Sequence, residues 1–202
     1  MPRPRKFRDA DVIAAARETF THQGFGGTTL DDLTTATGLG KQSLYNAFGG
    51  KRELYLRALT DSAAEAVTVV DAALNHSGAT PLERIRAHLL KLAIAFSGTN
   101  SEADLLTKAT VERAGHDSEV AHSALHTFER LEQSYRQCIV DAQEHGEIPA
   151  GSDPDALAAL FLALTRGMEV LGSAGVGRVQ LTAVAMTSLD LVATADPGTV
   201  QP

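Results

Sequence analysis

Four side chains around residue 44 have the chemistry to hydrogen-bond to the edges of DNA bases. Lys41 and Gln42 are donors, and base-pair geometry matches lysine to guanine and glutamine to adenine. Ser43 and Asn46 suit either a base edge or a phosphate. The types and spacing of these side chains therefore predict contact with a nucleic acid.

Neighbouring hydroxyl and ammonium groups suit the phosphate backbone. Tyr45 offers a hydroxyl, and Lys51 stands at an expected helix N-terminus, where backbone amides also favour an anion. Thr28 and Thr29 stand at the start of an earlier helix and have the same capacity. A basic arm that could follow the adjacent backbone or minor groove comprises Arg3, Arg5, Lys6 and Arg8.

Residues 28–59 supply the elements that would position these groups. Thr28, with Asp31 three residues later, predicts the N-cap of a short helix. Leu30, Leu33 and Ala36 are expected to face inward from that helix.

A tight turn and a second short helix are expected next. Gly38 supplies the positive φ that a sharp turn between helices needs, and Leu39 is expected to pin the turn to the core. The helix from about Lys41 to Phe48 would bury Leu44 and Phe48, which are four residues apart. This order of elements is a helix-turn-helix.

The charge of the chain is divided between its two parts. Residues 1–52 hold eight Lys or Arg and five Asp or Glu, a net charge of +3, within a protein of net charge −7. The remaining residues therefore carry −10. The first part can approach a polyanion and the second is repelled by it.

Helical spacing of alanine and leucine continues along the whole chain of 202 residues, and strand-like alternation is absent. The sequence predicts an all-α protein of about nine helices. Residues 1–60 would form a helix-turn-helix DNA-binding domain, and residues 61–202 a helical effector-binding and dimerisation domain. Outside the helix-turn-helix, the expected helices span about 9–22, 51–75, 80–97, 101–114, 118–145, 154–171 and 177–193.

Composition narrows the class of protein further. No segment is expected to be apolar for long enough to span a bilayer, which takes about 20 residues. The basic N-terminus leads into an amphipathic helix and does not resemble a signal peptide. The single cysteine, Cys138, excludes a disulfide within the chain. We expect a cytoplasmic protein with no membrane partner.

Residues 24–59 resemble the DNA-binding head of the tetracycline-repressor (TetR) family of bacterial regulators. The matching positions are Gly24-Phe25, Thr28-Thr29, Leu33, Ala36, Gly38-Leu39, Ser43-Leu44-Tyr45, Phe48, Lys51 and the leucines that follow it. Gly40 and Gly50 stand where the family often has a capping residue, and Ala47 replaces a common histidine or tyrosine.

The resemblance implies a homodimer that places two recognition helices in successive major grooves of a palindromic operator. It also implies that the last two helices pair across the dimer and that the middle helices enclose a small-molecule pocket.

An aromatic and apolar stripe on the expected helix 118–145 has two interpretations. It is either ordinary core or, with residues of neighbouring helices, the wall of a partly apolar effector pocket. The candidate pocket residues are Phe96, Phe128, Leu131, Tyr135, Cys138, Phe161 and Met168.

Three histidines fall close together before and within the same helix. His122 and His126 are four residues apart, with His116 nearby, and that spacing can hold a metal ion. Helix capping already explains the nearest acids, Asp117 and Glu119. We therefore expect no metal site.

Small residues crowd the last two expected helices. Such faces let helices approach closely, which favours a bundle completed by a second copy over packing within one chain. The residues are Ala156, Ala158, Ala159, Ala163, Gly167, Ala183, Val184, Ala185, Thr187 and Ser188.

The preferred hypothesis is a dimeric transcriptional repressor that a small-molecule effector releases from its operator. The alternative is a DNA-binding regulator or architectural protein without such an effector. An enzyme is disfavoured because no catalytic triad order, carboxylate pair or phosphate-binding glycine loop stands out, and the sequence predicts no cofactor.

Overall fold

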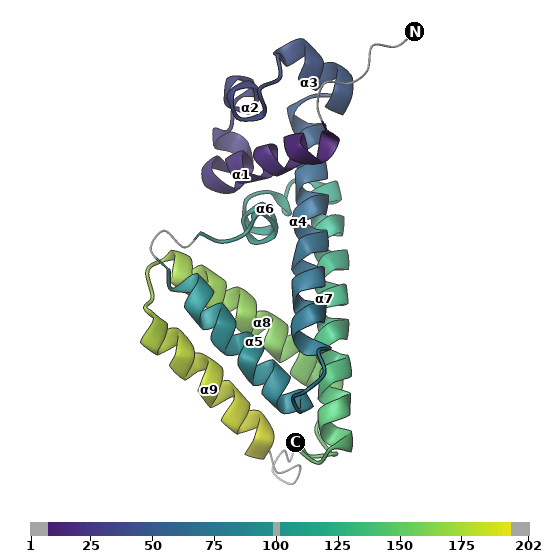
Figure 1. Ribbon diagram of the computed structural model, residues 1–202, viewed down its shortest axis with the longest axis vertical. Coiled ribbons are helices and arrows are strands. Elements are labelled where there is room, and N and C mark those ends of the chain that lie inside the picture. Colours follow the sequence, from purple (N-terminus) through teal and green to yellow (C-terminus); the bar gives the residue numbers. More distant parts are fainter. Residues whose placement is uncertain (1–7, 99–101, 195–202) are drawn as a thin grey trace. The chain divides into compact units, whose positions relative to one another are not determined.

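The computed structural model describes residues 8–98 and 102–194 of the chain. These residues form nine helices and no strand (Figure 1), which confirms the all-α class. The helices are α1 Asp9–Gly27, α2 Leu30–Thr37, α3 Lys41–Phe48, α4 Lys51–Leu74, α5 Pro81–Phe96, α6 Leu105–Arg113, α7 Ser118–Glu144, α8 Pro154–Ser173 and α9 Arg178–Thr194.

The helices pack into two compact units. The first holds the described residues up to Glu65 together with Asp104–Leu125, and the second holds the described residues of Ala66–Ala103 and those from His126 onward. Helix α6 therefore belongs to the same unit as the helix-turn-helix and packs against α1, although it lies beyond residue 60 in sequence. The assignment of functions to residues 1–60 and 61–202 stays a prediction.

The boundary between α1 and α2 differs from the expectation by one residue. The N-cap of α2 is Thr29, whose hydroxyl accepts the N–H of Asp32 (3.2 Å), while the Asp32 carboxylate accepts the N–H of Thr29 (2.7 Å). Thr28 instead ends α1, because both its N–H and its hydroxyl donate to the carbonyl of Gly24. The expectation that Thr28 caps α2 with Asp31 was wrong.

Helix α1 also runs further than expected, to Gly27, across a kink at Gly24. The φ of Gly24 is 71° and its ψ is 172°, a conformation that L side chains rarely adopt. The kink turns the following backbone amides out of the α1 hydrogen-bonding pattern.

Capping side chains determine where α5 and α6 begin. Thr80 and Glu83 form a capping box at the start of α5, with Pro81 in its first turn. Helix α6 begins at Leu105 instead of near residue 101, because the Asp104 carboxylate accepts the N–H of Thr107 (2.7 Å) and caps it there.

The core of the first unit gathers around one face of α3 and an aromatic cluster. Leu33, Leu44 and Phe48 are buried as expected, whereas Leu30 and Ala36 are exposed, contrary to expectation. Helix α2 has only eight residues, so its inward face has room for little beyond Leu33. The aromatic cluster joins α1 to α4 and comprises Phe20, Phe25 and Tyr55.

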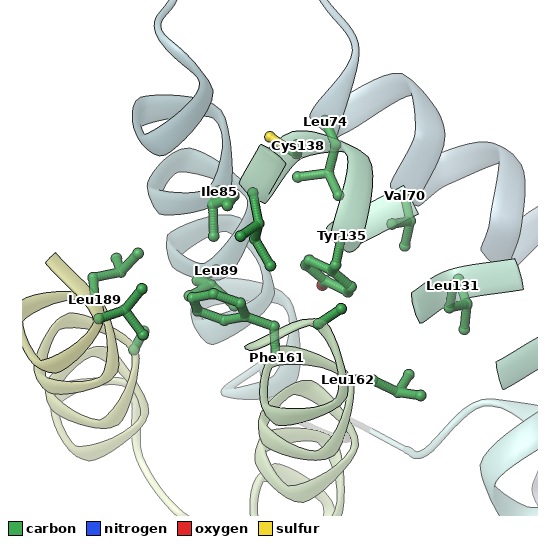
Figure 2. Packing of buried hydrophobic residues seen from close by; sticks show 14 of the residues in the cluster. Val70, Leu74, Ile85, Leu89, Leu131, Tyr135, Cys138, Phe161, Leu162 and Leu189 are labelled. Carbon is green, nitrogen blue, oxygen red and sulfur yellow. The ribbon is translucent and has the colours of Figure 1, made fainter. Parts of the chain in front are cut away.

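The core of the second unit draws on α4, α5, α7, α8 and α9. Figure 2 shows Tyr135 and Phe161 at its centre, with Leu89 beside them and Leu74 and Ile85 around them. Of these five residues, the sequence singled out only Tyr135 and Phe161, both as candidate pocket residues.

Helix α8 corrects one expectation from composition. It spans 20 residues, and a window of it reaches a mean hydropathy of 1.4, so by length and composition alone it is apolar enough to cross a membrane. The core helix of a globular protein meets the same criterion, and α8 contributes Phe161 and Met168 to the core.

Candidate nucleic-acid interface

Helix α3 is anchored by its apolar face and presents its polar face to solvent. Leu44 and Phe48 are each only 2% exposed, and the left-handed Gly49 ends the helix after them. The five predicted contact residues of α3 are all exposed: Lys41, Gln42, Ser43, Tyr45 and Asn46. Tyr45 keeps 65% of its surface accessible, a large value for a tyrosine in a helix.

Three polar side chains of α3 have partners in the unbound protein. Lys41 Nζ lies 2.7 Å from Asp31 Oδ1, and Gln42 Nε2 donates to Asn46 Oδ1 (2.9 Å). Exposed ion pairs of this kind contribute about 0–1 kcal/mol. DNA can therefore replace these contacts at low cost.

The first turn of α3 has no side-chain cap, as the sequence predicted. Gly40 is the N-cap and accepts the N–H groups of Ser43 and Leu44 through its carbonyl, but it has no side chain to cap the turn. Uncapped amides at a helix N-terminus can donate to a phosphate.

Lys51 is the first residue of α4 and is half-buried. Its ammonium lies 4.3 Å from the ring centroid of Phe25, within the range of a cation–π interaction. Gly50, with a φ of 123°, makes the turn that brings Lys51 to this position directly after α3.

The remaining predicted contacts are less uniform. Thr29 is exposed, and its hydrogen bonds lower the pKa of Asp32 below the usual range. Thr28 is 1% exposed, and its hydroxyl is engaged by Gly24, so the structure does not bring it to the surface with the others. Within the basic arm, Arg3, Arg5 and Lys6 lie outside the described residues, and Arg8 pairs with Asp11.

The sequence did not reveal a second set of charged groups in this unit. Arg52 and Arg113 both bond Asp117, with N–O distances of 3.1 Å, and Arg52 also bonds Glu119. The hydrogen bonds, that from Arg113 above all, lower the pKa of the Asp117 carboxyl. Only the Arg113–Asp117 pair, four residues apart on one helical turn, has a local spacing, because about 65 residues separate Arg52 from its partners.

The seven candidate pocket residues of the body do lie together. Leu131, Tyr135, Cys138 and Phe161 are buried in the core cluster (Figure 2). Met168 is buried in it too, and Phe96 and Phe128 pack against it. The rings of Tyr135 and Phe161 are stacked, with centroids 5.9 Å apart. Whether these residues bind a ligand stays a prediction.

Polar groups interrupt this apolar cluster. Burial raises the pKa of Tyr135 above its usual range, against the opposing effect of a hydrogen bond with Thr165. Burial likewise raises the pKa of Cys138 to about 11, which keeps it a thiol, and its sulfur lies 3.3 Å from the carbonyl of Pro81.

His88 was missed at the sequence level. It is 3% exposed, its Nε2 has no hydrogen-bond partner, and burial, with Lys91 and Arg166 nearby, lowers its pKa to about 4. Its spacing from the apolar residues Ile85 and Leu89 is the signal that could have placed it in the core.

The histidines considered as metal ligands do not converge. Over residues 8–98 and 102–194, the structure holds no group of three or more His, Cys, Asp or Glu side chains suited to a metal ion. His116 and His122 are exposed, and His126 Nδ1 lies 4.0 Å from Glu129 Oε2.

A short exposed helix anchored by two apolar side chains, preceded by a glycine turn, defines a helix-turn-helix DNA-binding protein. Residues 12–58 match the family model described as bacterial regulatory proteins, tetR family. Residues 81–174 match that of the tetracyclin repressor-like C-terminal domain. The chain belongs to this family, whose members are transcriptional regulators and not enzymes.

Individual relatives agree with this assignment. The chain is 30% identical over 166 residues to the helix-turn-helix-type transcriptional regulator YezE of Bacillus subtilis, covering 77% of this chain and 79% of YezE. It is 23% identical over 156 residues to the transcriptional repressor DhaR of a Mycobacterium species, covering 77% of each.

A solved structure shows the same fold. A cysteine mutant of the TetR-family regulator CifR, in complex with a 26-base-pair operator, superposes with a TM-score of 0.81 at 22% identity, covering 94% of this chain and 98% of CifR. At this level of identity the likeness shows the fold alone.

Proposed function

We propose that this regulator is a cytoplasmic, ligand-responsive repressor that binds a palindromic operator as a homodimer and leaves it when a small molecule binds the body. Residues 1–60 would bind DNA, and residues 61–202 would bind the effector and the second subunit. The exposed polar face of α3, held on buried Leu44 and Phe48, is the observation that carries the proposal.

Residues of α3 would read the operator from its major groove. Lys41 and Gln42 supply donors for base edges, each worth about 1–3 kcal/mol of discrimination. Ser43, Tyr45 and Asn46 are exposed on the same short helix and suit base edges or phosphates. Thr29, the exposed N-cap of α2, stays in the proposed site as a contact of the DNA phosphates, whereas Thr28, buried at the end of α1, is left out of it. The CifR complex with operator DNA supports this use of the fold.

Lys51 would bind a phosphate. It begins α4, where the helix dipole and the ammonium act in the same direction on an anion. The chain outside residues 1–52 is acidic, so such contacts concentrate on this part of the molecule.

The last two helices support the proposed dimer. Helix α8 exposes apolar or small side chains at helical spacing, and α9 exposes more. An apolar stripe open to water favours a partner, and a second copy of the chain satisfies that by symmetry. The exposed residues are Ala156, Leu160, Ala163, Gly167 and Leu171 on α8, and Val179, Ala183, Val184, Thr187 and Leu191 on α9.

The effector would enter the body among Phe96, Phe128, Tyr135, Phe161 and their neighbours. The predominance of apolar and aromatic side chains favours a partly apolar molecule. Its differential affinity for the DNA-bound and released states would set the extent of release.

Selection of binding sites from random duplex DNA tests the proposal. We expect enrichment of a palindrome, bound by two copies of the chain per site in sedimentation equilibrium. The purified protein–DNA complex is then screened against small apolar molecules that carry one polar group. Enrichment of a palindrome that no such molecule releases would favour the alternative, a regulator without an effector, and absence of any enriched palindrome would refute operator recognition.

A further inference from the structure

Helix α6 holds the turn that follows the kink in α1. The carboxylate of Glu112 accepts the N–H of Phe25 at Oε2 (3.0 Å) and the N–H of Gly26 at Oε1 (2.8 Å). One turn earlier on α6, Lys108 Nζ donates to the carbonyl of Thr21. Side chains of α6 therefore engage donors and an acceptor of the α1 backbone on both sides of the kink.

The kink at Gly24 makes this contact possible. The positive φ of Gly24 directs the next amides away from α1, so that one carboxylate can accept two of them. A Cβ on Gly24 would lie 3.0 Å from Glu112 Oε2, which shows how closely the carboxylate approaches. Hydrogen bonds from neutral amides to a carboxylate are charge-assisted and stronger than neutral ones.

Phe25, whose N–H donates to Glu112, also contacts a residue of the candidate DNA site. Its ring lies 4.3 Å from Lys51 Nζ and 4.1 Å from Arg113 Cζ, measured to the ring centroid. Tyr55 packs edge-on against it at 4.9 Å. The ring is thus fixed by α4 and α6 together, and the ammonium of Lys51 lies over it.

The two cations on this ring differ in their other partners. Arg113 bonds the buried carboxylate of Asp117, which fixes the guanidinium in place. Lys51 extends from the first turn of α4, where a phosphate would meet both its charge and the helix N-terminus. The ring would orient the ammonium, and a phosphate would neutralise it.

We propose that Glu112, acting through Phe25, is a positioning residue for the DNA contact of Lys51. Glu112 fixes the Gly24–Gly26 turn, the turn fixes the Phe25 ring, and the ring fixes the ammonium for its phosphate. This inference rests on the proposed phosphate contact of Lys51. It makes α6, which lies outside the segment matched as the DNA-binding domain, part of the operator-binding apparatus.

Salt dependence of operator binding tests the inference, because it counts phosphate contacts and does not respond to a general loss of folded protein. The slope of log K against log[salt] is about −0.9 for each phosphate bound. Lys51→Ala should weaken binding and make the slope less negative by about 0.9 for each DNA-bound head. Glu112→Gln keeps the side-chain length and one acceptor. It should also make the slope less negative, by a smaller amount.

A double-mutant cycle separates positioning from a general structural effect. Residues that act through the same contact have non-additive effects. Glu112→Gln and Phe25→Leu should each weaken binding about 3- to 10-fold in the native background and less than about 2-fold in the Lys51→Ala background. Val111→Ala, beside Glu112 on an exposed position of α6, is the matched control and should change neither slope nor affinity.

The outcomes are distinct. If Glu112→Gln weakens binding equally in both backgrounds, or leaves binding and slope unchanged, the inference is overturned while the Lys51 contact stands. If Lys51→Ala itself leaves the slope unchanged, the proposed phosphate contact fails and takes the inference with it. If Phe25→Leu unfolds, which a lost thermal transition would reveal, the test depends on the isosteric Glu112→Gln variant compared in the native and Lys51→Ala backgrounds.

Discussion

The rings of His88 and Tyr135 lie 6.0 Å apart, centroid to centroid, at the centre of the second unit. Tyr135 has a hydrogen bond with Thr165, whereas Nε2 of His88 has no hydrogen-bond partner. A buried polar atom left unpaired costs about 1–3 kcal/mol. The structure therefore carries a stability cost at the place where the candidate pocket residues meet.

His88 should make stability depend on pH. Its pKa falls from 6.5 to about 4 on folding, chiefly because burial disfavours the charged ring, with Lys91 and Arg166 acting in the same direction. The unfolded chain therefore binds the proton more readily, so stability is full above about pH 6.5 and is lost as the pH falls towards 4. The loss should reach about 3 kcal/mol at most.

Urea unfolding at pH 7 and pH 4.5 measures this loss, and His88→Leu should remove much of it. His122→Gln, which changes an exposed histidine of α7, is the control and should leave the pH dependence as it is. Equal pH dependence in the native protein and in His88→Leu would contradict the assignment to His88.

Two buried tyrosines should respond oppositely to loss of the hydroxyl. The Tyr55 hydroxyl has no hydrogen-bond partner, and burial raises the pKa of Tyr55 to about 12. Tyr55→Phe should therefore stabilise the fold by up to about 1 kcal/mol, because it removes an unpaired polar group. Tyr135→Phe breaks the bond with Thr165 and should destabilise by about 1 kcal/mol. Chemical denaturation of both variants measures the two signs, and destabilisation by Tyr55→Phe would show that its hydroxyl has a partner in solution.

The helix-turn-helix could be predicted almost to the residue because its determinants are local. Helix α3 has the predicted bounds, and its buried pair, Leu44 and Phe48, followed from helical spacing. The start of α2 could not be fixed in this way. Thr28 with Asp31 and Thr29 with Asp32 offer the same threonine–aspartate spacing. The choice between them depends on the carbonyl of Gly24, which engages Thr28 and leaves Thr29 to cap.

The contacts of α6 with α1 could not be predicted from the sequence for a different reason. Glu112 is separated from Phe25 and Gly26 by 87 and 86 residues, and no periodicity relates positions so distant. The candidate pocket residues, by contrast, were found together because each lies on the apolar stripe of its own helix. His88 lies on such a stripe too. Because a histidine is not counted in an apolar pattern, the pattern did not predict its burial.

A charge placed on the exposed stripe of α8 should separate the proposed dimer. Ala163 is exposed, so Ala163→Glu leaves the isolated subunit intact but would bury a carboxylate between two copies. We expect a shift from dimer to monomer in sedimentation equilibrium, with loss of operator binding. Gln133→Glu adds the same charge to an exposed position of α7 and should leave the dimer in place. A dimer of unchanged strength in Ala163→Glu would place the subunit contact elsewhere.

Removing the carboxylate beside Lys41 should tighten operator binding. Asp31 Oδ1 lies 2.7 Å from Lys41 Nζ on the exposed side of α2, where it attracts the ammonium and would repel a phosphate. Asp31→Asn keeps the shape of the side chain and removes its charge, and Asp31 does not cap α2, so the fold should be unaffected. Affinity for the selected operator should rise about 3- to 10-fold at low salt, with a smaller gain at high salt, because the effect is electrostatic. Fluorescence anisotropy across a salt series measures the gain, and Lys41→Ala combined with Asp31→Asn tests its origin. If Asp31→Asn binds no more tightly than the native protein, Lys41 does not contact the operator from this position.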